Sequence, residues 1–201
     1  MTDVLVPAER LQRWLENFTG RHGPADLSVF RGSLVGIAAD HSSFLASLPF
    51  SRGYEGPVEM ASFAATCVPP DDWGVLLVRK GGFAVARLAG SAFVESKVGQ
   101  RHVQGRTKAG GQSQQRFARR RENQARAAFE AAADHAARLI ADAPVVVVGG
   151  DASAVEAVLA DTRLRGLVVV GEFLTVPDPR RSVLESAVAE ACSVRISVTN
   201  A

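Results

Sequence analysis

The sequence predicts an α/β protein with a mixed β-sheet and a small additional segment at its N-terminus. Three strand-like runs follow one another across tight glycine turns, which is typical of antiparallel hairpins. A long amphipathic helix then leads into apolar runs that alternate with shorter helical segments. Hydrophobic side chains make up 47% of the 201 residues and charged side chains 22%, a composition that excludes a disordered or fibrous chain.

The opening segment, residues 1–70, predicts an N-terminal extension built from one helix and short strands. A helix is expected over 7–18, because a proline suits its first turn and four apolar side chains recur at helical spacing. Weak alternation of apolar and polar residues predicts strands over 27–38 and 58–68, and the proline and glycine content of 42–56 predicts a loop. Two prolines and two aspartates then mark the domain boundary.

Residues 71–201 predict the second, larger domain. Its expected elements are strands over 73–79, 83–88 and 92–98, a polar loop over 99–115, a helix over 114–141, a strand over 145–148, a helix over 152–160, a strand over 167–170, a helix over 182–191 and a strand over 194–198. Apolar residues repeat every three or four positions along the long helix. The glycine pair 149–150 lacks the GxGxxG spacing of a nucleotide site, so we expect an ordinary strand–helix turn there.

The sequence predicts no membrane span, secretion signal, metal site or bound cofactor. The longest apolar runs fall far short of the roughly 20 residues that cross a bilayer. Residues 1–10 contain two acids and no long apolar core, so we expect a cytoplasmic protein without membrane contact. Cys67 and Cys192 are expected to be packed free thiols, and the four histidines lack the spacing of zinc ligands.

Basic residues are strongly segregated along the sequence. Residues 97–126 contain nine basic side chains and one acidic one, and carry a net charge of +8 against −6 for the rest of the chain. A solvated helix face usually mixes both signs, so this window indicates a partner rich in phosphate, such as RNA. Arg116, Arg119 and Arg120 fall in the first turns of the expected helix, where basic side chains oppose the helix dipole. A requirement other than helix stability therefore selects these arginines.

The polar stretch before the basic helix carries the candidate catalytic residues. Gly110 and Gly111 have no Cβ and let the backbone approach a ligand closely. The side chain of Gln112 is neutral, can donate and accept hydrogen bonds, and is a poor general base. A structureless run of about 15 residues inside a compact domain is uncommon, and is usually either functional or disordered.

These residues resemble a known pattern. Gly110-Gly111-Gln112-Ser113, followed by Arg116-Phe117-Ala118-Arg119 and Arg121, looks like the GGQSxxRFARxR segment of archaeal and eukaryotic class-one peptide release factors. In those factors the segment opens the long helix of the catalytic domain, domain two, which has an RNase H-like core. With Lys97-Val98-Gly99 and Gln104-Gly105-Arg106-Thr107, the chain is similar to the actinobacterial branch of the Vms-type (VLRF) release-factor-like family.

The resemblance implies a peptidyl-tRNA hydrolase that acts on stalled ribosomes. Water would attack the ester between the nascent peptide and tRNA, while the glutamine orients that water and its backbone N–H stabilises the transition state. The release-factor pattern selects Gln112, after Gly110 and Gly111, whereas the GxxQ pattern of the Vms-type enzymes selects Gln114; we favour Gln112 and keep Gln114 as its competitor. The residues expected to contact rRNA or tRNA phosphates are Arg101, Arg106, Lys108, Arg116, Arg119, Arg120, Arg121 and Arg126.

The sequence also departs from full release factors. A chain of 201 residues has no room for their stop-codon-reading and GTPase-binding domains, which favours codon-independent rescue over termination. The expected partners are peptidyl-tRNA and the large-subunit rRNA of the peptidyl transferase centre, met by a monomer. Two alternatives stay open: a non-catalytic ribosome- or RNA-binding factor that uses the same basic helix, and a nuclease that cleaves the tRNA 3′ end.

Overall fold

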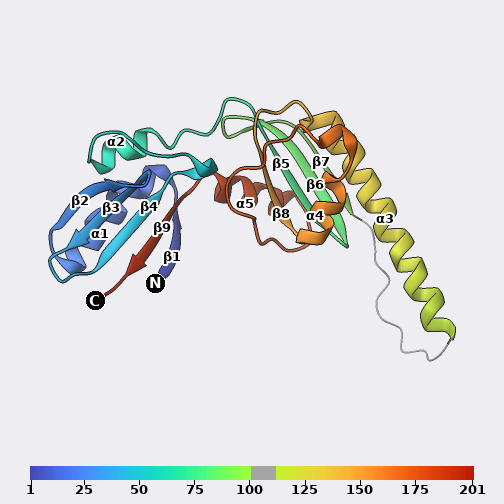
Figure 1. Ribbon diagram of the computed structural model, residues 1–201, viewed down its shortest axis with the longest axis horizontal. Helices are drawn as coiled ribbons and strands as arrows, with labels where there is room; N and C mark the ends of the chain where they lie inside the picture. The colour runs from blue at the N-terminus through green and yellow to red at the C-terminus, as the bar shows by residue number, and fades with distance from the viewer. Residues whose placement is uncertain (101–111) are drawn as a thin grey trace. The chain divides into compact units, whose positions relative to one another are not determined.

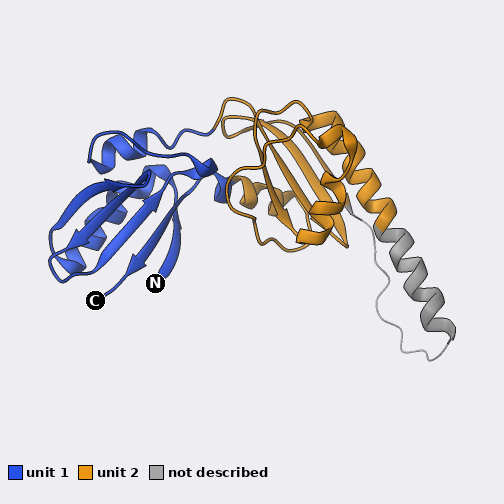
Figure 2. Cartoon of the chain, in the orientation of Figure 1, with its two compact units in different colours: residues 1–69, 189–201 blue, residues 70–188 orange. Residues whose placement is uncertain are grey.

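The computed structural model describes residues 1–100 and 112–201, with the side chains of residues 1–99 and 126–201. The expected mixed α/β class is confirmed, and the chain forms two compact units, each with its own sheet and hydrophobic core (Figure 1). Unit 1 consists of residues 1–69 and 189–201, and unit 2 of residues 70–188 (Figure 2).

Unit 1 is a five-stranded antiparallel sheet with helices packed on one face. Its strands lie in the order β1-β9-β4-β3-β2 and comprise β1 (Thr2–Val6), β2 (Ala25–Phe30), β3 (Ser33–Ala38), β4 (Ser43–Ser47) and β9 (Val194–Thr199). Helices α1 (Leu11–His22) and α2 (Met60–Ala65) bury Phe18 and Phe63 against alternate strand positions such as Phe44. The opposite face of the sheet exposes Ile37 and Leu45.

Unit 2 is a four-stranded mixed sheet covered by helices. Its strands lie in the order β7-β6-β5-β8, with bounds β5 (Trp73–Arg79), β6 (Gly82–Ala89), β7 (Ala92–Gln100) and β8 (Val146–Gly150). β8 is parallel to β5, and the other pairs are antiparallel. The helices are α3 (Gln112–Ile140), α4 (Ala152–Leu159) and most of α5 (Arg181–Ala191), whose last residues belong to unit 1. α3 packs across β5 and β6, and α4 packs across β5 and β8.

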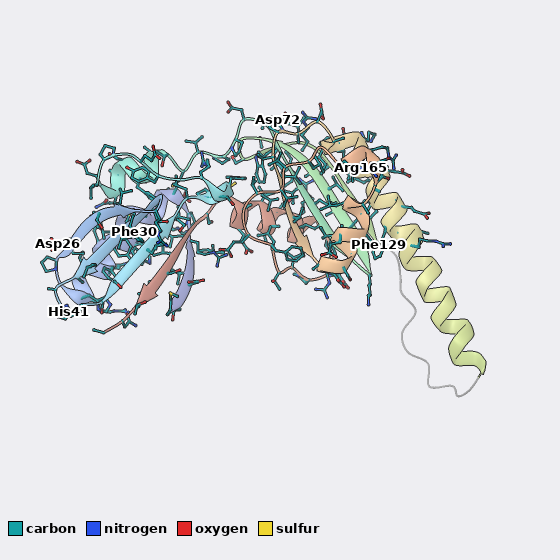
Figure 3. All side chains as sticks on the ribbon, viewed as in Figure 1. Asp26, Phe30, His41, Asp72, Phe129 and Arg165 are labelled. Atoms are coloured by element: carbon teal, nitrogen blue, oxygen red, sulfur yellow. The ribbon has the colours of Figure 1, made fainter. Side chains whose placement is uncertain are left out.

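The long helix lies close to the sheet because its inner side is built from alanine. Ala132, Ala136 and Ile140 are fully buried and pack on apolar side chains of β5 and β6. Ile140 lies against Gly74 of β5, where a Cβ would be 2.8 Å from its Cγ2 atom. Phe129 also packs on this core and marks the part of α3 that lies over the sheet (Figure 3).

Several short elements differ from the sequence-based expectation. Residues 58–68 contain helix α2 instead of a strand, because Met60, Phe63 and Cys67 are buried at helical spacing. The expected loop over 42–56 contains strand β4, and strand β1 was not expected. The expected strand over 167–170 is reduced to one isolated parallel bridge, between Val169 and Val146.

The C-terminal strand belongs to unit 1, although we expected it to close the sheet of the second domain. β9 pairs with β1 and β4, and its alternate residues Val194 and Ile196 are fully buried in the core of unit 1. The first 70 residues are therefore more than a small extension, since they share a complete sheet with the end of the chain. Unit 2 is in turn an insertion between two parts of unit 1.

Candidate functional site

The candidate catalytic segment lies between the end of β7 and the start of α3. Gly110 and Gly111, with Arg101, Arg106 and Lys108, lie outside the described residues. Gln112 is the first residue of α3, and Gln114 is its third. Arg116, Arg119, Arg120 and Arg121 follow within the first three turns of the helix, and the description of side chains begins again at Arg126.

The two candidate glutamines occupy opposite sides of α3. An α-helix turns by about 100° per residue, so positions 112 and 114 differ by about 200° around the axis. Position 112 is in line with the exposed Glu130, five turns further along. Position 114 is in line with Ala132, which is fully buried against the sheet. The helix backbone therefore places positions 112 and 114 on different faces of α3.

One aromatic ring joins the elements on both sides of the candidate segment. Phe83 of β6 is buried beside Gly99, near the end of β7, where a Cβ would lie 2.6 Å from the Cζ atom of the ring. The same ring stacks on His135 of α3, with 5.5 Å between the ring centroids. Only glycine leaves room for this ring at the end of β7.

Polar contacts hold β7 from two further elements. Glu95 accepts a hydrogen bond from Arg138 of α3 at 2.7 Å, which lowers the pKa of the Glu95 carboxyl. Arg181 of α5 donates to the hydroxyl of Ser96 at 2.6 Å and lies 4.4 Å from the centroid of the Phe93 ring. β7 is an edge strand, so these contacts stabilise an element that has only one sheet neighbour.

An arginine secures the other end of α3. Arg87 donates two hydrogen bonds to Asp72, at 2.8 and 2.7 Å, and also contacts Asp142 and the backbone oxygen of Leu139. Asp72 lies just before β5 (Figure 3). The hydrogen bonds from Arg87 to Asp72 and Asp142 raise the pKa of the Arg87 guanidinium, and the bond from Arg87 lowers the pKa of the Asp142 carboxyl. Strand residues thus contact the C-terminal end of α3 through Arg87, and contact the preceding turns of the helix at His135 and Arg138.

The run of mostly basic residues in α3 ends at Arg126, where the description of side chains begins again. The side chain of Arg126 is 75% exposed and lies 3.8 Å from Glu130. The next exposed charges along the helix, Glu130, Asp134 and Arg138, mix both signs. A phosphate would have to compete with the exposed Glu130 carboxylate for Arg126. Because exposed ion pairs are weak in water, Arg126 remains available to a phosphate.

Three other features in the described residues would indicate a different function: a group of metal ligands, a membrane-spanning helix and a phosphate-binding turn. No three His, Cys, Asp or Glu side chains there come together as metal ligands, and no helix there is long and apolar enough to cross a membrane. The turn at Gly149 and Gly150 is packed against the backbone of Leu174 and Val78. Asp151 then precedes α4 and accepts a hydrogen bond from Ser153, as in an ordinary strand–helix turn.

Sequence analysis missed the residues that support the candidate segment. Phe83, His135, Arg138 and Arg181 are ordinary residues in sequence, and only the fold brings them to β7. Gly99 carried a signal, because an isolated glycine inside a strand often marks a close approach of another group.

Comparison with known proteins places the chain in a family. Among solved structures, it resembles an archaeal translation termination factor, aRF1, at 12% sequence identity and a TM-score of 0.43. The match covers 94% of this chain and 63% of that one, so the chain spans less than two thirds of the archaeal factor. No curated protein matches by sequence. The family model described as Actinobacteria/chloroflexi VLRF1 release factor matches residues 71–197, and the chain therefore belongs to this family of release factors.

Proposed function

We propose that the protein is a peptidyl-tRNA hydrolase that releases nascent chains from stalled ribosomes or ribosomal subunits, without reading a codon. The supporting observation is its membership of the VLRF1 release-factor family, combined with a GGQ sequence that ends at the first residue of α3. Its partners would be peptidyl-tRNA and the rRNA of the peptidyl transferase centre, in the cytoplasm, and it would act as a monomer.

The reaction is hydrolysis of the ester that joins the nascent peptide to the tRNA ribose. Water attacks the ester carbonyl, negative charge develops on the carbonyl oxygen, and the ribose oxygen leaves with a proton. Positioning the water and donating hydrogen bonds to the developing charge supply most of the rate enhancement in such reactions. The protein needs no nucleophile of its own.

The position of Gln112 suits this chemistry. The first N–H groups of an α-helix have no partner inside the helix, and the helix dipole places partial positive charge at that end. The backbone N–H of Gln112 would donate to the oxyanion, and its side chain would orient the water. Gly110 and Gly111 would let the backbone pass close to RNA. We therefore favour Gln112 over Gln114 as the catalytic residue.

The basic residues around Gln112 would bind RNA phosphates and so position the start of α3. Arg116, Arg119 and Arg120 lie in the first turns of the same helix and would contact phosphates, together with Arg101, Arg106, Lys108, Arg121 and Arg126. Phosphate contacts of this kind fix position and carry no sequence information, as codon-independent release requires. About 24 Å of helix separates Gln112 from Ala128, the first buried residue of α3 among the described side chains, which gives the basic segment reach.

The test is peptide release from a ribosome–nascent-chain complex that has an empty A site and no stop codon. Wild type is compared with Gln112→Ala, Gln114→Ala and the control Gln124→Ala, which lies in the same helix. We expect release with an intact CCA end, a loss of at least 100-fold in Gln112→Ala, as for removal of one oxyanion-hole group, and little change in the control.

The other outcomes separate the competing functions. A loss confined to Gln114→Ala would transfer the catalytic role to that residue. A shortened tRNA would establish a nuclease. No release by folded, ribosome-bound wild type, with binding that depends on the arginines alone, would refute the hydrolase and favour a non-catalytic binding factor.

A further inference from the structure

Unit 1 contains a cavity whose lining residues all lie outside the segment that the family model matches, residues 71–197. Its volume is about 340 Å³, within the range of small-ligand sites, and it opens between α1 and the adjacent ends of β1 and β9. All of its lining residues belong to unit 1, so the cavity does not depend on unit 2. The catalytic chemistry proposed above makes no use of it.

The cavity has an aromatic floor. Trp14 and Phe18 of α1 are one helical turn apart and stack nearly parallel, with 5.5 Å between ring centroids and 15° between their planes. Both rings also meet Phe44 of β4 edge-on, at 5.0 and 5.1 Å, which fixes their orientation. Phe18 is itself buried, with its ring packed between Trp14 and His22. Trp14 is only partly buried, so Trp14 offers the aromatic surface to a ligand.

The rim of the cavity carries hydrogen-bonding groups on the same side of α1. Asn17 and Arg21 follow Trp14 at helical spacing, and Asn200 lies just after β9. Within the described part of the chain, no hydrogen bond or ion pair engages these three side chains. His22 also lines the cavity, but its ring is held by Asp40 at 2.8 Å.

This set of groups matches the chemistry of a nucleobase. A base is planar and stacks on aromatic side chains, and its edge carries adjacent donors and acceptors that amides such as Asn17 and Asn200 can meet. Arg21 supplies a cation for the attached phosphate. A purely apolar ligand would leave the two amides and the guanidinium unused, and a cationic ligand would be repelled by Arg21.

We propose that this cavity binds one unpaired nucleotide of RNA, with its base on Trp14 and its phosphate at Arg21. Unit 1 then adds an RNA contact to the basic segment of unit 2. The choice of RNA as the source of the nucleotide rests on the proposed function, whereas the nucleotide chemistry rests on the cavity alone.

The test titrates the full-length protein with adenosine 5′-monophosphate, uridine 5′-monophosphate and adenosine, and follows tryptophan fluorescence. Trp14 reports the cavity, and Trp73 is fully buried in unit 2 and is not one of the lining residues. We expect saturable quenching by both nucleotides. Trp14→Leu tests the stack by a separate readout, equilibrium dialysis, and should weaken binding at least fivefold, the equivalent of about 1 kcal/mol of stacking.

The variants assign each part of the site. Arg21→Gln should weaken binding of the nucleotides at least fivefold and leave adenosine unchanged, because only the phosphate needs the cation. Asn17→Leu should weaken the binding of all three ligands, because each of them carries a base. Arg13→Gln is the matched control, because Arg13 is exposed on the same helix and does not line the cavity.

Two results would overturn the inference. One is the absence of quenching by any nucleotide up to its solubility limit. The other is tighter binding of N-acetyltryptophanamide than of the nucleotides, which would identify a pocket for a protein side chain. Neither result involves ribosomes or release, so a failure here leaves the hydrolase proposal standing. Conversely, nucleotide binding that persists in Gln112→Ala would separate this site from the catalytic one.

Discussion

Replacing Gly99 with alanine tests whether the Phe83 ring ties the two ends of the candidate segment together. The new Cβ would lie 2.6 Å from Cζ of Phe83, closer than folded proteins allow, so the ring has to move. Overpacking of a core costs about 1–3 kcal/mol, and the lost stacking on His135 adds about 0.5–1.5 kcal/mol. We expect the free energy of unfolding of unit 2 to fall by about 1.5–4.5 kcal/mol, the sum of the two contributions.

The assay is urea unfolding, with Trp73 as the reporter of unit 2. The Trp14→Phe background removes the only other tryptophan, which belongs to unit 1. Gly166→Ala is the matched control, because a Cβ there meets no atom within 4 Å, and its free energy of unfolding should stay within about 0.5 kcal/mol of wild type.

A double-mutant cycle decides the cause of the effect. In a Phe83→Leu background the side chain beside Gly99 is smaller, so the same alanine substitution should cost at least about 1 kcal/mol less. An equal cost in both backgrounds would refute the role of the ring. Under conditions where the variant is folded, release should also fall in Gly99→Ala and not in Gly166→Ala, because the end of β7 is displaced.

Three further predictions address charge and burial. Arg126→Gln should keep the free energy of unfolding within about 0.5 kcal/mol of wild type, because the ion pair of Arg126 is exposed. The same substitution should weaken ribosome binding and reduce the salt dependence of that binding. An unchanged salt dependence would show that Arg126 does not contact the ribosome. Hydrogen bonds from Arg163 lower the pKa of Asp161 to about 2, so the stability this carboxylate contributes is complete above its ordinary pKa of 3.8 and is lost as the pH falls through about 2. Urea unfolding should therefore show a smaller loss of stability over this acid range in Asp161→Asn than in wild type, and parallel profiles would contradict the assignment. Burial raises the pKa of the Cys67 and Cys192 thiols to about 11, so native protein should react slowly with iodoacetamide near pH 8 and rapidly once unfolded in urea; equal rates would show that the thiols are accessible.

The elements with strong local signals could be predicted from the sequence. The strands β5, β6 and β7 are separated by tight glycine turns, and α3 repeats its apolar positions over many turns. Such patterns depend on neighbours in sequence and survive in the fold. The GGQ sequence, Gly110-Gly111-Gln112, is likewise contiguous, and its catalytic role stays a prediction.

The remaining features depend on contacts between distant residues. β9 was recognised as a strand but assigned to the wrong sheet, because alternation of apolar residues does not reveal which strands lie alongside it. The short helix α2 was mistaken for a strand, since its few apolar residues fit both periods. The stack of Phe83 on His135 joins residues 52 positions apart, and no local pattern could have shown it.

The position of β9 between β1 and β4 also governs the order in which the chain can fold during synthesis. Unit 2 is contiguous and can fold as soon as it has left the ribosome, whereas unit 1 stays incomplete until its last strand has been made. Until then, β1 and β4 both present unpaired edges, which are prone to aggregation. A fragment of residues 1–69 lacks this strand and should not form the native sheet. Because Thr2 pairs with Val198, a circular permutant that begins at residue 189 and links residue 201 to residue 1 would make unit 1 contiguous and allow it to fold first.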